Sequence, residues 1–223
     1  MNSIDWKNYY NREHEIYRFT PQHDPAENWR VAFVTALLPA SQLDRVLDAG
    51  CGDGHLCGVL ATRARRVTGC DIAFPRLQLA RQSVPVSMAE LTRPPYRTGV
   101  FDLVTLVEVL EHLPEPVPVL RALAGLSRRH LLVTVPYKQR LQIALCPHCL
   151  KSFPLDGHLT EFDEPALRAM LAEAGLRVVK LDKFFPPAAW EQSAAIRWWP
   201  RAGREALRRL LQACGLVAKD NAL

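Results

Sequence analysis

Two carboxylates and a set of glycines in the first half of the chain have the types and spacing to hold a polar ligand. Asp48 ends a short apolar run, and Gly50, Gly52 and Gly54 follow it at alternate positions. Glycine allows φ > 0 and lets another molecule approach the backbone closely. A helical pattern begins directly after the glycines, and the first turn of a helix offers free N–H groups to a ligand. Asp71 ends the next apolar run. The pattern indicates a ligand bound at the carboxyl ends of parallel strands.

His112 is the first candidate for moving a proton. It follows Glu108 by one helical turn, and Glu108 ends another apolar run, so both side chains can face one pocket. Histidine titrates near neutral pH, which suits a general base. Two other interpretations stay open, since Glu108 could cap the following helix and His112 could pack locally. Tyr137 and His158 are the second and third candidates for this pocket.

Cys146 and Cys149 form a Cys-x-x-Cys pair, which is the usual half of a tetrahedral zinc site. His158 is the candidate for the third ligand, and the fourth stays open between Asp156, His148 and a residue elsewhere. Two other interpretations are reduced cysteines without a ligand and a redox pair. Three further cysteines lie in apolar or glycine-rich segments, where small buried thiols are expected: Cys51, Cys57 and Cys70.

An alternation of apolar runs and helical periodicities must position these residues. Strands are predicted over residues 45–48, 66–71, 85–88, 101–107, 130–135 and 177–185. Helices are predicted between them over residues 56–63, 75–82, 116–126 and 164–174. Such alternation is typical of an α/β domain with a Rossmann-like, mostly parallel sheet and helices on both faces. We expect one domain of this kind over residues 45–223, with a Cys/His insertion at 136–160 after the fifth strand.

The two ends of the chain are expected to add to this domain. Residues 1–44 are predicted to form an N-terminal helical cap, with helices over 5–17 and 26–38, that covers the glycine turn or packs on the sheet edge. Residues 186–223 form a C-terminal extension with an amphipathic helix over 202–213. Its apolar face carries leucines and its other face arginines, so it packs on the domain, contacts an anionic membrane surface or holds a phosphorylated substrate.

Composition sets the class of protein. A chain of 223 residues with 48% hydrophobic residues can bury one sizeable core. No apolar run is long enough to span a membrane and no signal peptide is visible, so we expect a cytoplasmic protein. The net charge of +5 suits an anionic substrate, but the basic residues are too dispersed to indicate nucleic acid.

Four segments together resemble the class I S-adenosylmethionine-dependent methyltransferases, most of all the small-molecule group that includes ubiquinone-pathway O-methyltransferases. They are Val46 to Gly54, Gly69 to Ile72, Phe101 to Val104 and Glu108 to Leu113. The resemblance covers residues 45 to about 185 and implies that S-adenosylmethionine is the cofactor. The implied cofactor-binding residues are Asp48, Gly50, Cys51, Gly52, Gly54, Asp71, Ile72, Ala89, Glu90 and Glu108.

The resemblance also assigns parts of the cofactor. It implies that Gly50 and Gly52 lie against the aminoacyl part, that Asp48 orients the ammonium group and that Asp71 accepts the ribose hydroxyls. One position departs from the family pattern, because Met88 stands where the family often has an acid for the adenine amino group. The adenine contact is then left to Glu90 or to a backbone group.

The expected reaction is methyl transfer to a substrate oxygen, assisted by His112. The expected substrate is a small or carrier-linked metabolite, such as a sugar or a natural-product intermediate. One alternative is a nucleic-acid (RNA) methyltransferase with a zinc-ribbon-like insertion. Against it, Glu108 to Glu111 stand where a base-flipping Asn-Pro-Pro-Tyr motif would follow the fourth strand. A second alternative is a non-catalytic protein that binds S-adenosylmethionine, and the intact glycine motif weighs against it.

Overall fold

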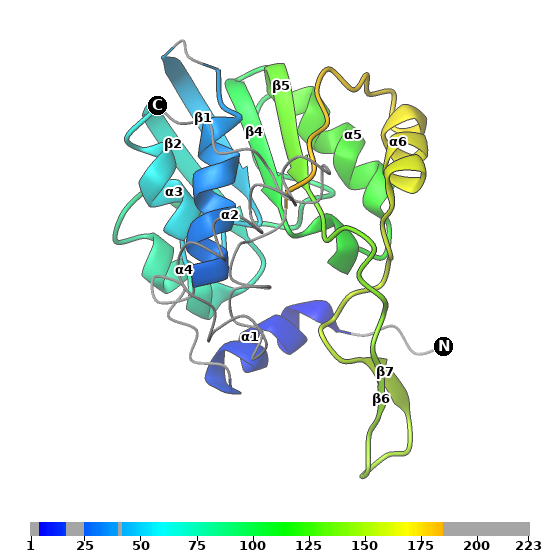
Figure 1. The fold of residues 1–223 in the computed structure, drawn as a ribbon. Helices are drawn as coiled ribbons and strands as arrows, with labels where there is room; N and C mark the ends of the chain where they lie inside the picture. The colour runs from blue at the N-terminus through cyan, green and yellow to red at the C-terminus, as the bar shows by residue number, and fades with distance from the viewer. Residues whose placement is uncertain (1–4, 17–24, 40–41, 185–223) are drawn as a thin grey trace, which may run out of the picture. The chain divides into compact units, whose positions relative to one another are not determined.

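The computed structural model describes residues 5–16, 25–39 and 42–184 (Figure 1). These residues fall into two compact units. The first contains residues 5–16, 39 and 42–179, and the second contains residues 25–38 and 180–184. The predicted cap over residues 1–44 is divided between the two units. The predicted helix over residues 202–213, with the rest of the 186–223 extension, lies outside the described residues.

A five-stranded parallel sheet forms the centre of the first unit, with the strand order β3-β2-β1-β4-β5. The strands are β1 Leu43–Ala49, β2 Ala64–Asp71, β3 Val86–Met88, β4 Phe101–Val107 and β5 Ser127–Thr134. Val46 of β1 lies opposite Val67 on one side and Leu103 on the other. This sheet confirms the predicted Rossmann-like fold class.

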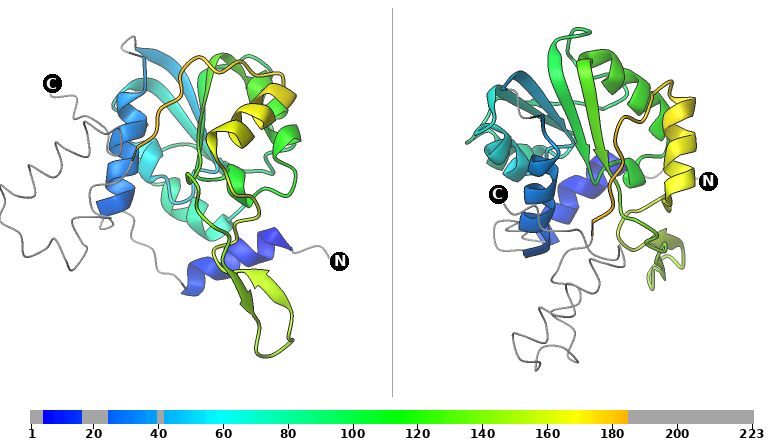
Figure 2. Two further views of the ribbon diagram at one scale, coloured as in Figure 1. Left: turned by 45° about the vertical axis from the view of Figure 1, so that its right-hand side comes forward. Right: turned by 45° about the horizontal axis from the view of Figure 1, so that its top comes forward.

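Helices cover both faces of the sheet (Figures 1 and 2). They are α3 His55–Leu60, α4 Phe74–Ala80, α5 Pro116–Leu126 and α6 Glu164–Glu173. Crossovers between parallel strands are right-handed, and the chain moves outward from β1 in opposite directions toward β3 and toward β5. The helices of the two halves therefore lie on opposite faces, with α3 and α4 against β2 and with α5 against β4 and β5.

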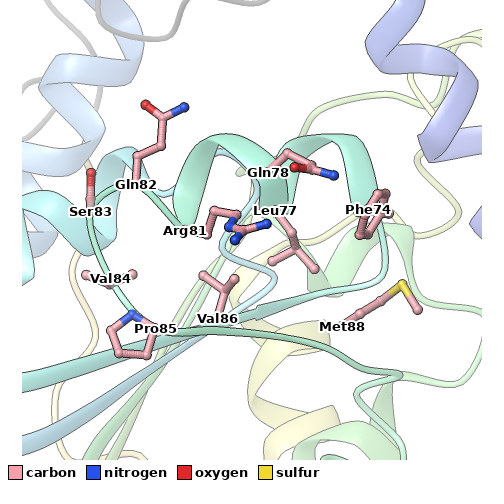
Figure 3. A pocket seen from close by; sticks show the side chains of 10 residues that line it. All are labelled: Phe74, Leu77, Gln78, Arg81, Gln82, Ser83, Val84, Pro85, Val86 and Met88. Atoms are coloured by element: carbon pink, nitrogen blue, oxygen red, sulfur yellow. The ribbon is translucent and has the colours of Figure 1, made fainter.

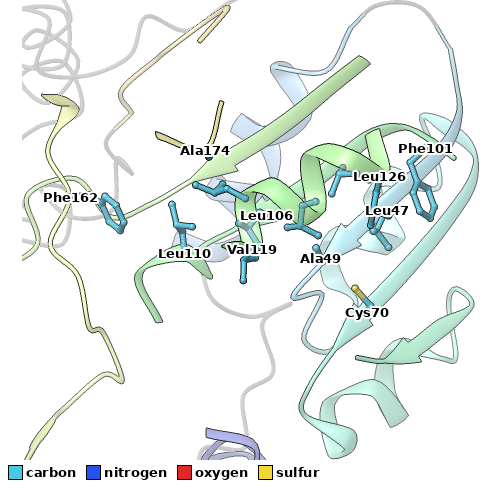
Figure 4. Close-up of a cluster of buried hydrophobic side chains, with 13 residues drawn as sticks. Leu47, Ala49, Cys70, Phe101, Leu106, Leu110, Val119, Leu126, Phe162 and Ala174 are labelled. Carbon is cyan, nitrogen blue, oxygen red and sulfur yellow. The ribbon is translucent and has the colours of Figure 1, made fainter. Parts of the chain in front are cut away.

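The main apolar core lies between β1, β4 and α5 (Figure 4). Leu47, Leu106, Leu120 and Leu123 are fully buried there, and Phe162 joins them from the segment before α6. Both faces of β4 are covered, which explains why its sequence is almost continuously apolar. The core fixes the carboxyl end of β4, from which the candidate site residues continue.

Helix α1, Trp6–Ile16, belongs to the sheet unit and contacts α4. The side-chain oxygen of Asn11 accepts a hydrogen bond from the Phe74 N–H at 3.0 Å, and Glu13 pairs with Arg76 at 2.7 Å. These contacts place α1 beside the glycine turn. Helix α2, Pro25–Ala36, belongs to the second unit, where the ring of Phe33 stacks on that of Phe184.

The insertion after β5 contains a two-stranded antiparallel hairpin, β6 Ile143–Leu145 and β7 Ser152–Pro154. A parallel bridge between Tyr137 and Phe162 joins the beginning of the insertion to the segment that follows it. In both figures the hairpin projects away from the sheet beside α1 (Figures 1 and 2). The predicted insertion is therefore confirmed as a separate element of the sheet unit.

The strand predicted over residues 177–185 is wrong for residues 177–184, whose backbone forms no strand. Alternating apolar residues favour a strand only where a neighbouring strand and an apolar surface receive them. Val179 is 69% exposed, so this side of the alternation has no apolar surface to cover. In the described part of the chain, no helix is both long and apolar enough to cross a membrane.

Candidate active site

The glycine turn joins the end of β1 to α3 and adopts a left-handed backbone at each alternate position. The φ angles are +75° at Gly50, +53° at Gly52 and +84° at Gly54. A Cβ atom on Gly50 would lie 2.4 Å from a methyl carbon of Val109, so the segment after β4 packs directly on the turn. A Cβ atom on Gly52 would meet nothing closer than 3.8 Å. The turn is thus closed toward the protein at Gly50 and open to a ligand at Gly52.

Gly54→Ala is expected to lower the free energy of unfolding by about 2–5 kcal/mol. The new Cβ would lie 2.9 Å from the Ala80 Cα, a backbone atom that cannot rotate away. The cost adds about 1–2 kcal/mol for the left-handed backbone to about 1–3 kcal/mol for overpacking. Urea unfolding measures it.

Gly58→Ala is the matched control for this prediction, because a Cβ on Gly58 meets no atom within 4 Å. Gly58 lies inside α3, where alanine stabilises the helix by about 0.5–1 kcal/mol. Equal stabilities of the two variants would contradict the packing described at Gly54.

Asp71 links the end of β2 to the glycine turn. One carboxylate oxygen accepts the Gly52 N–H and the other accepts the Ala73 N–H, each at 2.8 Å. Burial raises the pKa of Asp71, whereas the N–H groups of Ala73 and Gly52 and the Arg76 guanidinium lower it. The structure thus brings together Gly52 and Asp71, two of the predicted cofactor-binding residues. It holds the Asp71 carboxylate at the carboxyl end of β2.

Asp48 lies beneath the turn and is 2% exposed. Its carboxylate accepts a hydrogen bond from the Thr105 hydroxyl at 2.7 Å and one from the Cys57 thiol at 3.3 Å. Cys51 is also buried, and a Cβ on Gly69 would lie 2.7 Å from its sulfur. Asp48 and Cys51, which are both predicted cofactor-binding residues, therefore support the turn from its buried side.

The predicted adenine side follows β3. The Ala89 N–H donates to the backbone oxygen of Asp71 at 2.9 Å, which fixes this loop to the end of β2. Glu90 and Met88 are exposed, whereas Ile72 is half-buried. A cavity of about 670 Å³ lies along the outer side of α4 and β3 (Figure 3). Apart from Met88, its lining is distinct from the predicted site: Phe74, Leu77, Gln78, Arg81, Gln82, Ser83, Val84, Pro85, Val86 and Met88.

Glu108 ends β4 with φ = +53°, a left-handed conformation that is uncommon for a residue with a side chain. Two contacts to β5 hold it there. Its N–H donates to the backbone oxygen of Thr134 at 3.2 Å, and the Thr134 hydroxyl donates to its carboxylate at 2.8 Å. The next helical turn, η2 Leu110–His112, begins after Val109, so Glu108 does not cap it. Strained backbone of this kind gathers at functional sites.

A carboxylate and two histidines meet just after this strained residue. The His112 and His158 rings lie 4.6 Å apart between centroids. One oxygen of Glu111, which is 1% exposed, lies 3.8 Å from Nε2 of His112 and 4.0 Å from Nε2 of His158. Each of the three side chains offers a ligand atom, and these atoms lie within 4.8 Å of one another. We call these three residues the acceptor cluster.

The surroundings of His112 in the acceptor cluster keep its ring neutral. Burial and the neighbouring His158 lower the pKa of His112 to about 4. Its ring is therefore uncharged near neutral pH and can accept a proton or bind a cation. Because the ideal base has a pKa near the working pH, a value near 4 makes His112 a weaker base than an ordinary histidine.

Aromatic residues of α1 lie against this cluster. Tyr10 contacts the His112 ring edge to face, with 6.0 Å between centroids, and Trp6 stacks on Tyr10. A Cβ on Gly157 would lie 3.4 Å from Nδ1 of His112 and 3.5 Å from the Tyr10 hydroxyl. Helix α1, η2 and the end of the insertion therefore meet at one point. Tyr10 and Glu111 were not predicted from the sequence. For Glu111, its place in the segment from Glu108 to Leu113 was a signal that could have indicated it.

The predicted zinc ligands are not brought together. Cys146 and Cys149 lie at the tip of the hairpin, whereas His158 lies beside His112. Within the described ranges, the cluster of metal-ligating atoms contains His158 and no cysteine. Tyr137 lies at the base of the insertion, where its backbone pairs with Phe162.

Comparisons with known proteins show which family the chain resembles. A family described as "Methyltransferase domain" matches residues 21–181. A ubiquinone biosynthesis O-methyltransferase of Xanthomonas axonopodis pv. citri is 33% identical, over 67% of this chain and 69% of that protein. The one from Bordetella parapertussis is 38% identical, but the match spans only 38% of this chain and 38% of that protein.

Solved structures show that the fold is shared. An S-adenosylmethionine-dependent methyltransferase from Aquifex aeolicus has a TM-score of 0.58 at 19% identity, covering 74% of this chain and 93% of that one. One from Archaeoglobus fulgidus has a TM-score of 0.59 at 19% identity, covering 79% and 78%. Since the family match covers more than half of the sequence and includes the glycine turn and Asp71, the chain belongs to the class I S-adenosylmethionine-dependent methyltransferases.

Proposed function

We propose that this methyltransferase transfers a methyl group to an oxygen atom of a small or carrier-linked metabolite. The acceptor cluster carries the proposal, because a buried carboxylate and two histidines lie one helical turn from the residue that packs on Gly50. Curated relatives named ubiquinone biosynthesis O-methyltransferase support an oxygen acceptor. A sugar or a natural-product intermediate is the substrate class that we favour.

The cofactor half of the site follows from the contacts of the turn. The open side of Gly52 receives the aminoacyl part, and Asp71 accepts hydrogen bonds from the ribose hydroxyls with its remaining lone pairs. Asp48 acts on the ammonium group from beneath the turn, through water, because its carboxylate is already held by Thr105 and Cys57. When bound, S-adenosylmethionine supplies a methyl group on a positively charged sulfur.

The acceptor half of the site must position a hydroxyl and remove its proton. Tyr10 and Trp6 form an aromatic wall beside His112, which suits a flat or apolar acceptor. His112 contacts the acceptor oxygen, and Glu111 lies close enough to stabilise positive charge on the His112 ring. General acid–base catalysis of this kind contributes about 10²–10⁴-fold to a rate.

The same three ligand atoms favour a second way of activating the hydroxyl. One carboxylate and two neutral imidazoles form a ligand set suited to a divalent transition-metal ion. A cation in this place would supply positive charge that lowers the pKa of the acceptor hydroxyl. Because the pKa of His112 is lowered to about 4, we favour cation binding over proton transfer to a free imidazole.

Removal of divalent cations with a chelator is expected to lower the methyl-transfer rate by about a hundredfold or more, and added Mn²⁺ or Zn²⁺ restores it. His158→Gln should be slow with or without cation, whereas His130→Gln, which changes an exposed histidine of β5, should respond as the wild type does. A rate that chelation leaves unchanged would assign the hydroxyl proton to His112 alone.

The acceptor itself is found by incubating fractions of a cell extract with methyl-labelled S-adenosylmethionine and locating the label by NMR. We expect a labelled methyl ether or ester on a low-molecular-weight product. Label on nitrogen or carbon would contradict the oxygen acceptor. Label in RNA would contradict the small-molecule assignment and favour the nucleic-acid alternative. No label in any fraction, with S-adenosylmethionine still bound, would favour the non-catalytic alternative.

A further inference from the structure

The tip of the β6–β7 hairpin holds two cysteine sulfurs in a tight turn. The Cys146 N–H donates to the Lys151 backbone oxygen and the Leu150 N–H donates to the Cys146 backbone oxygen, both at 2.9 Å. Leu150 has φ = +55°, a left-handed conformation that closes the turn after Cys149. Cys149 is exposed and Cys146 partly so, and both are free thiols. The turn therefore presents a preformed pair of sulfurs to solvent.

Other groups of the same turn surround the sulfur of Cys146. The N–H groups of Cys149 and His148 and the Cys149 thiol all contact it. The thiolate is the form of cysteine that binds metal ions. Soft thiolate ligands select Zn²⁺ among the abundant divalent ions. An exposed Cys-x-x-Cys turn that is closed by backbone hydrogen bonds is the usual half of a tetrahedral zinc site.

The hairpin also exposes apolar side chains that a monomer leaves in water. Ile143 is 62% exposed, Leu145 64% and Leu150 72%. An isolated two-stranded hairpin is marginally stable at best, and small elements of this kind are stabilised by a metal ion or by association. The sulfur pair and the apolar side chains lie on the same short element. A single association of this element with a partner would therefore complete the metal site and bury the apolar side chains.

A tetrahedral zinc ion that was bound by these two sulfurs would need two further ligands. His158, the predicted third ligand, lies with Glu111 and His112 instead. Across residues 42–184, with 5–16 and 25–39, no third ligand atom lies close to both sulfurs. The remaining ligands therefore come from outside these residues.

We propose that Cys146 and Cys149 bind one zinc ion together with the same two cysteines of a second copy of this chain. A two-fold axis through the ion pairs the hairpin with itself, as an isologous interface requires. The contact also brings the exposed leucine and isoleucine side chains of the two hairpins together. The proposal is independent of the methyl acceptor and of the acceptor cluster, because it concerns only the hairpin tip.

The test uses the whole chain with His158→Gln as the background, so that the acceptor cluster does not contribute metal. Metal analysis should find about half an equivalent of zinc per chain, because one ion is shared by two chains. Light scattering should give the mass of a dimer that a chelator converts to a monomer. Cys146→Ser and Cys149→Ser should each lose the zinc and be monomeric at the same concentration. Cys214→Ser is the control that removes the one cysteine outside the residues that the structure describes, and it should change neither quantity.

Each other result overturns part of the proposal. One zinc per chain in a monomer, lost in Cys214→Ser, would show that the chain completes its own site. No zinc after reconstitution under reducing conditions would refute metal binding. A dimer that persists in Cys146→Ser would separate association from the metal. If the serine variants misfold by circular dichroism, cobalt replaces zinc in the wild type, and the absence of sulfur-to-cobalt charge-transfer absorption would refute thiolate ligation.

Discussion

Asp71→Asn is expected to weaken the binding of S-adenosylmethionine by about a hundredfold or more. A hydrogen bond to a charged group contributes about 1.5–3 kcal/mol, and we assign two of them, from the ribose hydroxyls, to this carboxylate. The change also disturbs the turn, because the two oxygens of Asp71 accept the N–H groups of Gly52 and Ala73. An asparagine keeps one acceptor and places an NH₂ group opposite the other N–H. Calorimetry with S-adenosylmethionine measures the change in Kd.

Asp53→Asn is the matched control, since it removes the same charge from the same turn. Asp53 accepts only the His55 N–H among the hydrogen bonds described for it, at 3.2 Å. Its substitution is expected to change Kd by no more than about fivefold, the range for a solvated carboxylate. Similar Kd values for Asp71→Asn and the wild type would show that Asp71 holds only the turn and that the ribose lies elsewhere.

The second large effect is expected at His112. His112→Ala should lower kcat by about 10²–10⁴-fold while the affinity for S-adenosylmethionine changes little. Whether His112 takes the hydroxyl proton or holds a cation, its loss leaves the acceptor oxygen protonated. The ring is not part of the glycine turn, and it contacts His158 and Tyr10 on the acceptor side. Steady-state kinetics with the acceptor found in the extract, together with calorimetry, separates the two quantities.

His130→Ala removes a histidine from the exposed side of β5 and serves as the control for His112→Ala. It should leave kcat within about twofold of the wild type, because surface substitutions away from a site usually change energies by less than about 0.5 kcal/mol. An unchanged kcat in His112→Ala would contradict the assignment of the acceptor cluster. A loss of cofactor affinity equal to the loss of kcat would instead mean that His112 supports the turn through Val109.

The sheet could be predicted because its central strands are buried on both faces. β4 has the predicted bounds, since Phe101–Val107 is nearly all apolar and is followed by the polar residue Glu108. β5 begins earlier than predicted, at Ser127, which pairs with Phe101 at the beginning of β4. The first residues of β5 are polar and do not enter the core, so the apolar pattern did not indicate them. The false strand at 177–185 had the right alternation but no surface to pack on. The local sequence pattern therefore predicted a strand correctly where both faces of the strand are buried. It failed where strand formation depends on a neighbouring strand or an apolar surface.

The proximity of the glycines, Asp48 and Asp71 was predictable for a related reason. The glycines, Asp48 and Asp71 lie at the carboxyl ends of adjacent strands, and the order of strands in a parallel sheet brings such residues together. The proposed acceptor half depends on contacts between distant segments. His158 reaches the cluster because the insertion returns to η2, where the Leu159 N–H donates to the backbone oxygen of Glu111 at 2.7 Å. No spacing in the sequence indicates that return, so His158 was predicted both as the third candidate for the pocket of His112 and as a zinc ligand beside the cysteines.

This division has a consequence for how the acceptor could change in the course of evolution. Helix α1, η2 and the end of the insertion form the side that we assign to the acceptor, and none of them is a strand of the sheet that holds Asp48 and Asp71. On this assignment, we expect substitutions in the insertion to leave cofactor binding unchanged, while the hydrogen bond from the Leu159 N–H to the Glu111 backbone oxygen keeps the end of the insertion beside His112. On the proposed assignment, a change of substrate requires substitutions in the 136–160 segment and in the tyrosines of α1, and none in the strands that carry Asp48 and Asp71.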